Sequence, residues 1–340
     1  MLALTGATGF LGRRVARRLA ASGERVRCLV RGSSDLDPLR SYVGEGLWPS
    51  LEVVRANLLD AADCGASMDG CDRLLHVAAG LSGATSTLVL NSVSTTKAVL
   101  RAAADLDMRR AVVVSSLGIY DNSAVGRGDA LTEETPLDPD PPARDPYTYT
   151  KLMQEREARA IAADRGLPLV VVRPGVIIGP GRGVVGGRCG LNVGPLLVQM
   201  GGRQTVPLTY VDNCADALVR AATAEGVEGE TFNVLDDDLP SASRLVRMAR
   251  RNGQRVRRVW LPGPLVGTAC SAYHLYSRIS GGQLPPILTR YRARAMWRPV
   301  RYDNSAAKRG LDWRPEVPIG EAVRRCVTGE DPASATGAAA

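Results

Sequence analysis

Three regularly spaced glycines, placed between an apolar run and a helical pattern, constrain the fold of this chain more than any other feature. The apolar run is Leu2–Thr5, and Gly6, Gly9 and Gly12 follow it at intervals of three residues. Residues 13–20 then alternate arginines with an apolar stripe, as in an amphipathic helix. A strand, a glycine turn and a helix in this order are typical of the first βαβ unit of a parallel sheet.

Short apolar runs alternate with helical patterns through the first half of the chain. The alternation predicts an α/β protein with a Rossmann-type, doubly wound parallel sheet. At 340 residues, of which 45% are hydrophobic, the chain is long enough for one large domain or two closely packed ones. The strands that we expect are Leu2–Thr5, Val26–Val30, Leu51–Val54, Arg73–Ala78, Ala111–Ser115 and Leu169–Val172.

The glycine turn predicts a dinucleotide site. Backbone N–H groups at such a turn and at the following helix N-terminus can face a pyrophosphate, and a missing Cβ lets the ligand approach closely. A purely structural turn is the alternative. At the end of the second strand, NAD-binding proteins place an acidic residue, but here Val30 is followed by Arg31, which favours NADP. NAD is the alternative cofactor. In that case Asp35 contacts the ribose, and Arg31 is only a solvent-exposed arginine.

The segment Asp145–Lys151 indicates proton-transfer chemistry. Asp145 is suited to cap a helix and Pro146 to open it, so Tyr147 and Lys151 fall one turn apart on one helix face. A nearby ammonium group and the helix dipole would lower the pKa of the phenol from its usual value of about 10. Tyr149 is the rival phenol, but no lysine follows it at the same spacing.

A pair of hydroxyl residues ends the strand that begins at Ala111. Ser115 and Ser116 would lie at the carboxyl edge of the sheet, where open α/β sheets bind ligands. Ser116 can donate a hydrogen bond to a carbonyl oxygen or accept one from an alcohol. The alternative is that the two serines only terminate the strand.

These segments resemble the extended short-chain dehydrogenase/reductase family, also called the NAD-dependent epimerase/dehydratase family. His76–Ala79, Arg173–Pro180 and Tyr210–Asn213 add to the resemblance, which covers about residues 1–235. It implies a catalytic set of Ser116, Tyr147 and Lys151. The dinucleotide contacts that it implies are Gly6, Thr8, Gly9, Phe10, Leu11, Gly12, Arg31, Asn57, Leu58, Ala78, Ala79, Asn91, Tyr147, Lys151 and Pro174.

Three departures from the family pattern bear on the reaction. Asn57 replaces the usual aspartate after the third strand, and Leu117-Gly118 replaces the acidic pair of the 4,6-dehydratases. Arg173 stands where nucleotide-sugar epimerases commonly carry asparagine, which resembles the branch of ketone reductases and sterol-type dehydrogenases. We therefore expect hydride transfer between nicotinamide and a secondary alcohol or ketone of a small-molecule substrate. A sugar epimerase that retains its NAD and a non-catalytic dinucleotide sensor are the alternatives.

The domain organisation follows from these assignments. We expect residues 1–175 to form the NAD(P)-binding domain, with 203–235 returning to it. Residues 176–202 and 236–327 would form a smaller C-terminal substrate lobe, and 328–340 a disordered tail. Residues 121–144 would cover the substrate, and Arg182 and Arg188 would face an anionic group or solvent. The resemblance also implies a homodimer.

Composition argues against other classes of protein. The net charge of +8 comes from about 40 arginines scattered along the chain, so no nucleic-acid partner is expected. Seven cysteines without a CxxC pair and only two histidines predict no metal site and a reducing cytosol. We expect no signal peptide, because Leu2–Thr5 runs straight into the glycine turn without a basic segment before it. Val259–Ser277 carries two prolines and predicts no membrane span; an interfacial helix there is the alternative to a substrate-covering or core helix.

Overall fold

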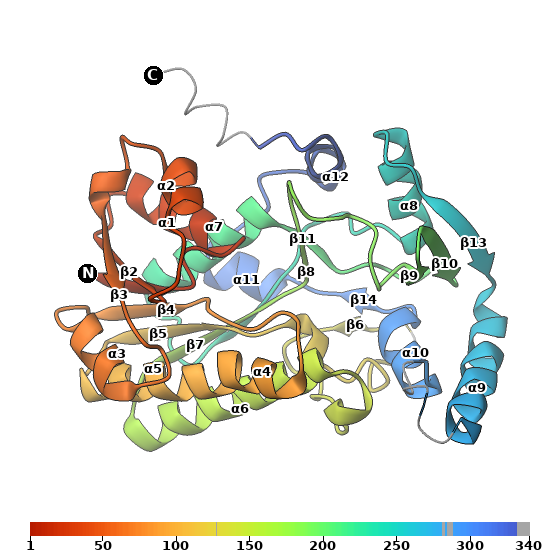
Figure 1. Cartoon of the computed structure of the whole chain (residues 1–340), viewed down its shortest axis with the longest axis horizontal. Helices are drawn as coiled ribbons and strands as arrows, with labels where there is room; N and C mark the ends of the chain where they lie inside the picture. The colour runs from red at the N-terminus through yellow and green to blue at the C-terminus, as the bar shows by residue number, and fades with distance from the viewer. Residues whose placement is uncertain (127, 281–282, 284–287, 332–340) are drawn as a thin grey trace.

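A seven-stranded parallel sheet forms the centre of the molecule (Figure 1). The structure, a computed structural model, describes residues 1–126, 128–280, 283 and 288–331. The strand order is β12-β7-β5-β4-β1-β2-β3, so the direction of winding reverses between β1 and β4. This confirms the predicted α/β, doubly wound fold. The strands are β1 (Leu2–Thr5), β2 (Val26–Val30), β3 (Leu51–Arg55), β4 (Arg73–His76), β5 (Arg110–Val114), β7 (Leu169–Pro174) and β12 (Thr231–Val234).

Helices cover both faces of this sheet and enclose two apolar cores (Figure 1). One face carries α1 (Gly12–Ala21), α2 (Asp37–Val43) and α7 (Val211–Thr223). The other carries α3 (Ala61–Met68), α4 (Thr85–Val89), α5 (Thr95–Asp105) and α6 (Pro146–Arg165). Strands buried on both faces read as continuous apolar runs, which explains why β5 and β7 were recognisable in the sequence.

Smaller elements lie outside the central sheet. A parallel pair joins β8 (Val176–Ile178) to β11 (Leu208–Tyr210), and a second joins β6 (Ala130–Leu131) to β14 (Arg301–Tyr302). A three-stranded sheet contains β9 (Gly190–Val193), β10 (Leu196–Met200) and β13 (Arg257–Leu261). The remaining helices are α8 (Ala242–Arg251), α9 (Gly263–Ile279), α10 (Arg290–Trp297), α11 (Ser305–Gly310) and α12 (Ile319–Thr328). Single-turn segments lie at Trp48–Ser50, Leu90–Ser94, Leu117–Ile119 and Pro141–Ala143.

The C-terminal part packs more closely on the sheet than the predicted boundaries suggest. Trp313 and Ile319, expected in the substrate lobe, lie in the same apolar core as α1 and α7. The expected tail begins inside α12, and Asp331 forms an ion pair of 2.6 Å with the buried Arg14 of α1. The rest of the expected tail, 332–340, lies outside the described residues. Within the described ranges, none of the helices combines the length and the apolar character needed to cross a bilayer.

Candidate active site

A cavity of about 950 Å³ opens at the carboxyl edge of the sheet, across the point where the winding reverses. Its wall includes the residues that follow β1, β2, β3, β4, β5 and β7. Every residue that the sequence analysis placed in the catalytic set or against the dinucleotide lines this one cavity. They are Gly6, Thr8, Gly9, Phe10, Leu11, Gly12, Arg31, Asn57, Leu58, Ala78, Ala79, Asn91, Ser116, Tyr147, Lys151 and Pro174.

The glycine turn fits a ligand that approaches the backbone closely. Gly6 has φ +75°, and a Cβ there would lie 2.8 Å from the amide nitrogen of Ala78. A Cβ on Gly12 would lie 1.9 Å from the carbonyl oxygen of Gly6. Side chains are therefore excluded at both positions. Among the described residues, no side chain caps the N-terminus of α1, which leaves its amide groups beside the cavity for an anion such as a pyrophosphate.

Basic residues lie at the end of the cavity next to β2, where we expect the ribose that carries the 2′-phosphate in NADP. Arg31 and Ser34 line it, whereas the carboxylate of Asp35 accepts the N–H of Asp37, 3.0 Å away, and is not part of the lining. Arg55 of β3 donates to the carbonyl oxygen of Arg31 and adds a second cation beside this turn. The sequence analysis did not single out Arg55, because its role depends on β3 lying next to β2.

The start of α6 brings the expected hydroxyl groups together. Asp145 accepts the N–H of Thr148 at 2.8 Å and Pro146 opens the helix, which confirms the predicted cap. Tyr147 is half-buried and lines the cavity together with Ser116, whose hydroxyl lowers the pKa of the Tyr147 phenol. The rival Tyr149 does not line the cavity. The structure therefore places Tyr147, and not Tyr149, opposite the end of β5.

The pKa of Tyr147 differs from the sequence-based expectation. Burial raises it above the ordinary value, and the hydrogen bond with Ser116 and the charge of Arg182 offset only part of this effect. The ammonium group of Lys151 is directed elsewhere, since it donates to the carbonyl oxygen of Val114 and to Oε1 of Gln154, both at 2.9 Å. Without a ligand, the protein thus keeps the phenol protonated.

Lys151 begins a buried chain of polar groups that the sequence analysis missed. Nε2 of Gln154 donates to Oγ1 of Thr96 at 2.9 Å, and this hydroxyl lies 2.8 Å from Nε2 of His76. Nδ1 of His76 lies 2.8 Å from Oγ1 of Thr5, the last residue of β1. Burial lowers the pKa of His76 to about 3 and that of Lys151 to about 8. The imidazole is therefore neutral at physiological pH, and only the arrangement of α5, α6 and β4 reveals the chain.

Arg173, one of the departures from the family pattern, has a structural role. Its guanidinium donates to the carboxylate of Glu155 on α6 and to the phenol of Tyr120, all three groups being buried. The Tyr120 hydroxyl in turn donates to Asn233 of β12 at 2.8 Å. Burial alone would raise the pKa of Glu155, but its hydrogen bond with Arg173 outweighs this and holds the pKa below its ordinary value. This pair fixes the end of β7 against α6.

Arginines are grouped at the lobe side of the cavity. Arg182 lies 4.3 Å over the ring of Phe10, and Arg188 donates to the carbonyl oxygen of Ala295 at 3.2 Å. Both line the cavity, together with Arg292 of α10. Within the residues that the structure describes, neither Arg182 nor Arg188 forms an ion pair with a carboxylate. Burial lowers the pKa of both, so an anionic group would be favourable here.

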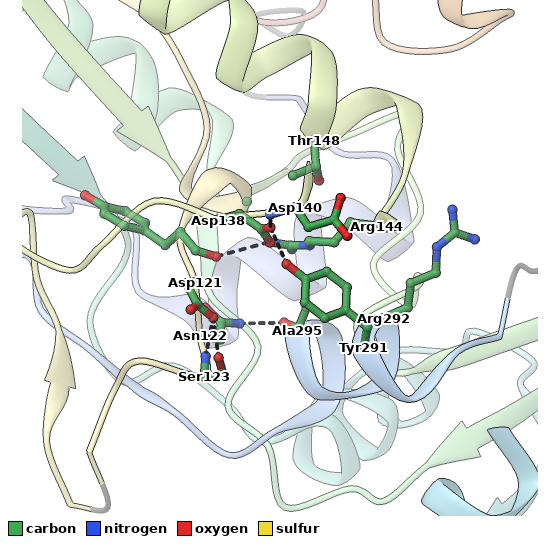
Figure 2. A network of polar contacts seen from close by, with 12 residues as sticks. Asp121, Asn122, Ser123, Asp138, Asp140, Arg144, Thr148, Tyr291, Arg292 and Ala295 are labelled. Atoms are coloured by element: carbon green, nitrogen blue, oxygen red, sulfur yellow. Dashed lines mark hydrogen bonds and ion pairs between the residues drawn. The ribbon is translucent and has the colours of Figure 1, made fainter. Parts of the chain in front are cut away.

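The segment expected to cover the substrate is joined to α10 (Figure 2). Arg144 pairs with Asp138 at 2.8 Å, both side chains being buried, and the phenol of Tyr291 on α10 donates to the same carboxylate. Asn122 donates to the carbonyl oxygen of Ala295. Of this segment, 121–144, Arg144 reaches the cavity wall. The contacts in Figure 2 therefore hold the segment to α10, next to Arg144 in the cavity wall.

Comparison with known families decides the assignment. The sequence model described as the NAD dependent epimerase/dehydratase family matches residues 2–234. This chain belongs to the NAD dependent epimerase/dehydratase family. The resemblance stated from the sequence is confirmed, and the matched region ends at the last strand of the central sheet, β12.

The curated relatives of this chain include a reductase and a sterol demethylase protein. Cinnamoyl-CoA reductase 1 of Oryza sativa subsp. japonica is 35% identical over 183 residues, which are 53% of this chain and 54% of that protein. Sterol demethylase protein B of Methylococcus capsulatus is 33% identical over 180 residues, 52% of this chain and 51% of that protein. The chain thus spans about half the length of these curated relatives.

Solved structures share the fold over almost the whole chain. The crystal structure of gox2253 has a TM-score of 0.80 at 23% identity and covers 97% of each chain. UDP-glucuronic acid 4-epimerase from Bacillus cereus, solved with NAD, has a TM-score of 0.68 at 18% identity and covers 96% of this chain and 97% of that one. At these identities the likeness establishes the fold of the second lobe as well as that of the sheet.

Proposed function

We propose that this chain is an NAD(P)-dependent oxidoreductase that transfers a hydride between nicotinamide and a secondary alcohol or ketone carbon. The observation that carries the proposal is that Ser116, Tyr147 and Lys151 line the same cavity as the glycine turn. The exclusion of side chains at Gly6 and Gly12, and the open N-terminus of α1, fit a dinucleotide's pyrophosphate. When bound, the nicotinamide ring supplies or accepts the hydride.

The residues of this chain would divide the remaining chemistry. The Tyr147 phenol, kept protonated by burial, donates its proton to the oxygen of a ketone, and in the reverse direction it takes the proton of an alcohol. Ser116 orients the same oxygen by a hydrogen bond. Lys151 places a positive charge at the end of β5, where it binds the ribose and favours the phenolate when that form develops.

The proposal favours NADP over NAD and a reductase over an epimerase. Arg31 in the cavity wall, with Arg55 behind it and Asp35 turned toward α2, supports recognition of a 2′-phosphate. The similarity to cinnamoyl-CoA reductase 1 supports reductase chemistry, whereas the likeness to the epimerase is one of fold.

The test is a turnover screen on the purified chain. NADPH and NADH are each offered with a panel of ketones and aldehydes, NADP⁺ and NAD⁺ with secondary alcohols, and nucleotide sugars are supplied without added dinucleotide. Net oxidation of NADPH that depends on a ketone is the expected result. Interconversion of a nucleotide sugar by protein that carries bound NAD, with no net consumption of added dinucleotide, would assign the epimerase instead. Tight binding of dinucleotide without any turnover would assign a sensor.

A further inference from the structure

The solvent-exposed side of α9 carries large apolar side chains, whereas the exposed side of a surface helix is usually polar. Val266, Cys270 and Ser277 are buried, and the first two pack in an apolar cluster with α10. Four large apolar side chains lie on the opposite side of the helix, and all of them are exposed. They are Leu265, Leu275, Tyr276 and Ile279. Ile279, at 74%, is more exposed than any other large apolar side chain among the described residues.

The strand that leads into α9 extends this apolar surface. Val259 and Trp260 of β13 are 54% and 59% exposed, and β13 is an edge strand of its three-stranded sheet. Figure 1 shows β13 running directly into α9 along one outer edge of the molecule, away from the central sheet. We call these six side chains, on β13 and α9, the outer face. Six exposed large apolar side chains within 21 residues exceed the scattered ones that soluble monomers normally show.

The charge around the outer face has a single sign. Residues 239–302 contain thirteen arginines and neither aspartate nor glutamate. Arg255 and Arg257 lie just before the exposed residues of β13, Arg278 lies on α9, and Arg290 opens α10, all of them exposed. In the part of the chain that the structure describes, none of these four forms an ion pair with a carboxylate. Arg40, Arg109 and Arg165, exposed elsewhere in the chain, do have such partners: Glu45, Asp72 and Asp105.

We propose that the outer face docks on an anionic lipid bilayer, with α9 lying in the plane of the headgroups. A helix with one apolar side and an arginine-rich surround binds at the boundary between headgroups and acyl chains. Arginines near the bilayer surface are attracted to anionic lipids. Trp260 and Tyr276 suit this depth because their rings are apolar and their tips polar.

A second copy of this chain fits the outer face less well. Pairing of two identical faces would bring two acid-free, arginine-rich segments together, and the like charges would oppose association. The bilayer supplies both the apolar depth and the negative charge that the face lacks. The inner side of α9 packs on α10, which carries Arg292 and Met296 of the cavity wall, so docking would place the lobe side of the cavity near the lipid surface. The inference does not depend on the reaction proposed above.

Vesicle sedimentation tests the proposal on the full chain. The protein is mixed with vesicles of phosphatidylcholine alone or of phosphatidylcholine with phosphatidylglycerol, and bound and free protein are separated by ultracentrifugation. We expect binding to the phosphatidylglycerol vesicles, a weakening of this binding as salt is added, and a blue shift of tryptophan fluorescence that is lost in Trp260→Phe. Equal binding to both vesicles, or binding to neither, would overturn the proposal.

Matched variants separate the outer face from the rest of the surface. Leu275→Ser/Ile279→Ser should weaken vesicle binding by at least about tenfold, whereas Leu90→Ser, also exposed, should not. Arg257→Gln/Arg258→Gln should weaken it and reduce its salt dependence, compared with Arg101→Gln/Arg156→Gln, which changes two exposed arginines of α5 and α6. Unchanged melting temperatures show that the variants are folded. If Leu275→Ser/Ile279→Ser instead turns a dimer into a monomer in gel filtration and leaves sedimentation unchanged, the face is a self-interface and the proposal is wrong.

Discussion

The ammonium group of Lys151 donates a 2.9 Å hydrogen bond to the carbonyl oxygen of Val114, the last residue of β5. Lys151 lies one turn after Tyr147 on α6, and Ser116 lies two residues after Val114. This single contact therefore joins the helix that carries the phenol to the strand end that carries the hydroxyl. This alignment of α6 with β5 brings Tyr147 and Ser116 into the wall of the same cavity.

Replacement of the phenol tests the assigned acid. We expect Tyr147→Phe to lower kcat by a factor of about 10² to 10⁴, the range usual for a general acid or base. Among the described residues of the cavity wall no other tyrosine is present to replace it. The affinity for dinucleotide, measured by fluorescence titration, should change little. Tyr149→Phe is the matched control, and a Tyr147→Phe enzyme with turnover within about twofold of the parent would contradict the role.

The preference for NADP is tested at the end of β2. We expect Arg31→Ala to weaken NADP binding by about tenfold and NAD binding much less, because an exposed arginine contributes modestly to holding a 2′-phosphate. Calorimetric titration with both dinucleotides measures the two affinities. Arg156→Ala, an exposed arginine of α6 outside the cavity, is the control. Equal losses for NADP and NAD would remove the argument for NADP.

The sequence was informative wherever a local pattern determines the structure. The bounds of β1 and β2 were predicted as they are found, and the cap at Asp145 follows from local chemistry. The strand β12 was not predicted as a strand, because four residues, Thr231–Val234, carry little periodicity before their pairing with β7 is known. The fourth strand was predicted to run from Arg73 to Ala78. In the structure β4 ends at His76, and the residues after it line the cavity.

Features that depend on contacts between distant elements were not predictable. The chain from Lys151 to His76 crosses α5, α6 and β4, and no spacing in the sequence relates Gln154 to Thr96. The expected lowering of the Tyr147 pKa failed for the same reason. The i to i+4 spacing places Lys151 on the correct side of α6, but burial and the carbonyl oxygen of Val114 decide where its ammonium group points.

The buried polar chain makes a prediction about the pH profile of turnover. Oε1 of Gln154 accepts from the Lys151 ammonium and so favours its charged form. Gln154→Leu should lower the apparent pKa of the basic limb of the profile, and Gln154→Glu should raise it, each by about one unit. Steady-state kinetics across the pH range measures both. Shifts of the same sign in the two variants would show that Gln154 acts on the fold and not on the charge of Lys151.

Lys151 should also make the stability depend on pH. Burial lowers its pKa to about 8 in the folded chain, whereas an unfolded lysine titrates at about 10.4. Between these values the unfolded chain binds a proton that the folded chain has released. The free energy of unfolding should therefore rise with pH from about 8 to about 10, by about 3 kcal/mol at most. Denaturant titrations of the parent and of Lys151→Met isolate this contribution, and parallel curves for the two proteins would contradict it.

Removal of one partner from the buried Arg173–Glu155 pair should cost more than removal of both. Glu155→Gln leaves the Arg173 guanidinium buried without a counter-charge and should lower the free energy of unfolding by about 3 to 5 kcal/mol. Glu155→Leu/Arg173→Met removes both charges and should cost less than the sum of the single changes. Asp238→Asn, which breaks an exposed pair with Arg244, should cost at most about 1 kcal/mol. Chemical denaturation of the parent, Glu155→Leu, Arg173→Met and the double variant gives the coupling energy. If the losses in the free energy of unfolding at positions 155 and 173 are additive, the ion pair itself contributes nothing. Apolar contacts around the pair would then hold β7 against α6.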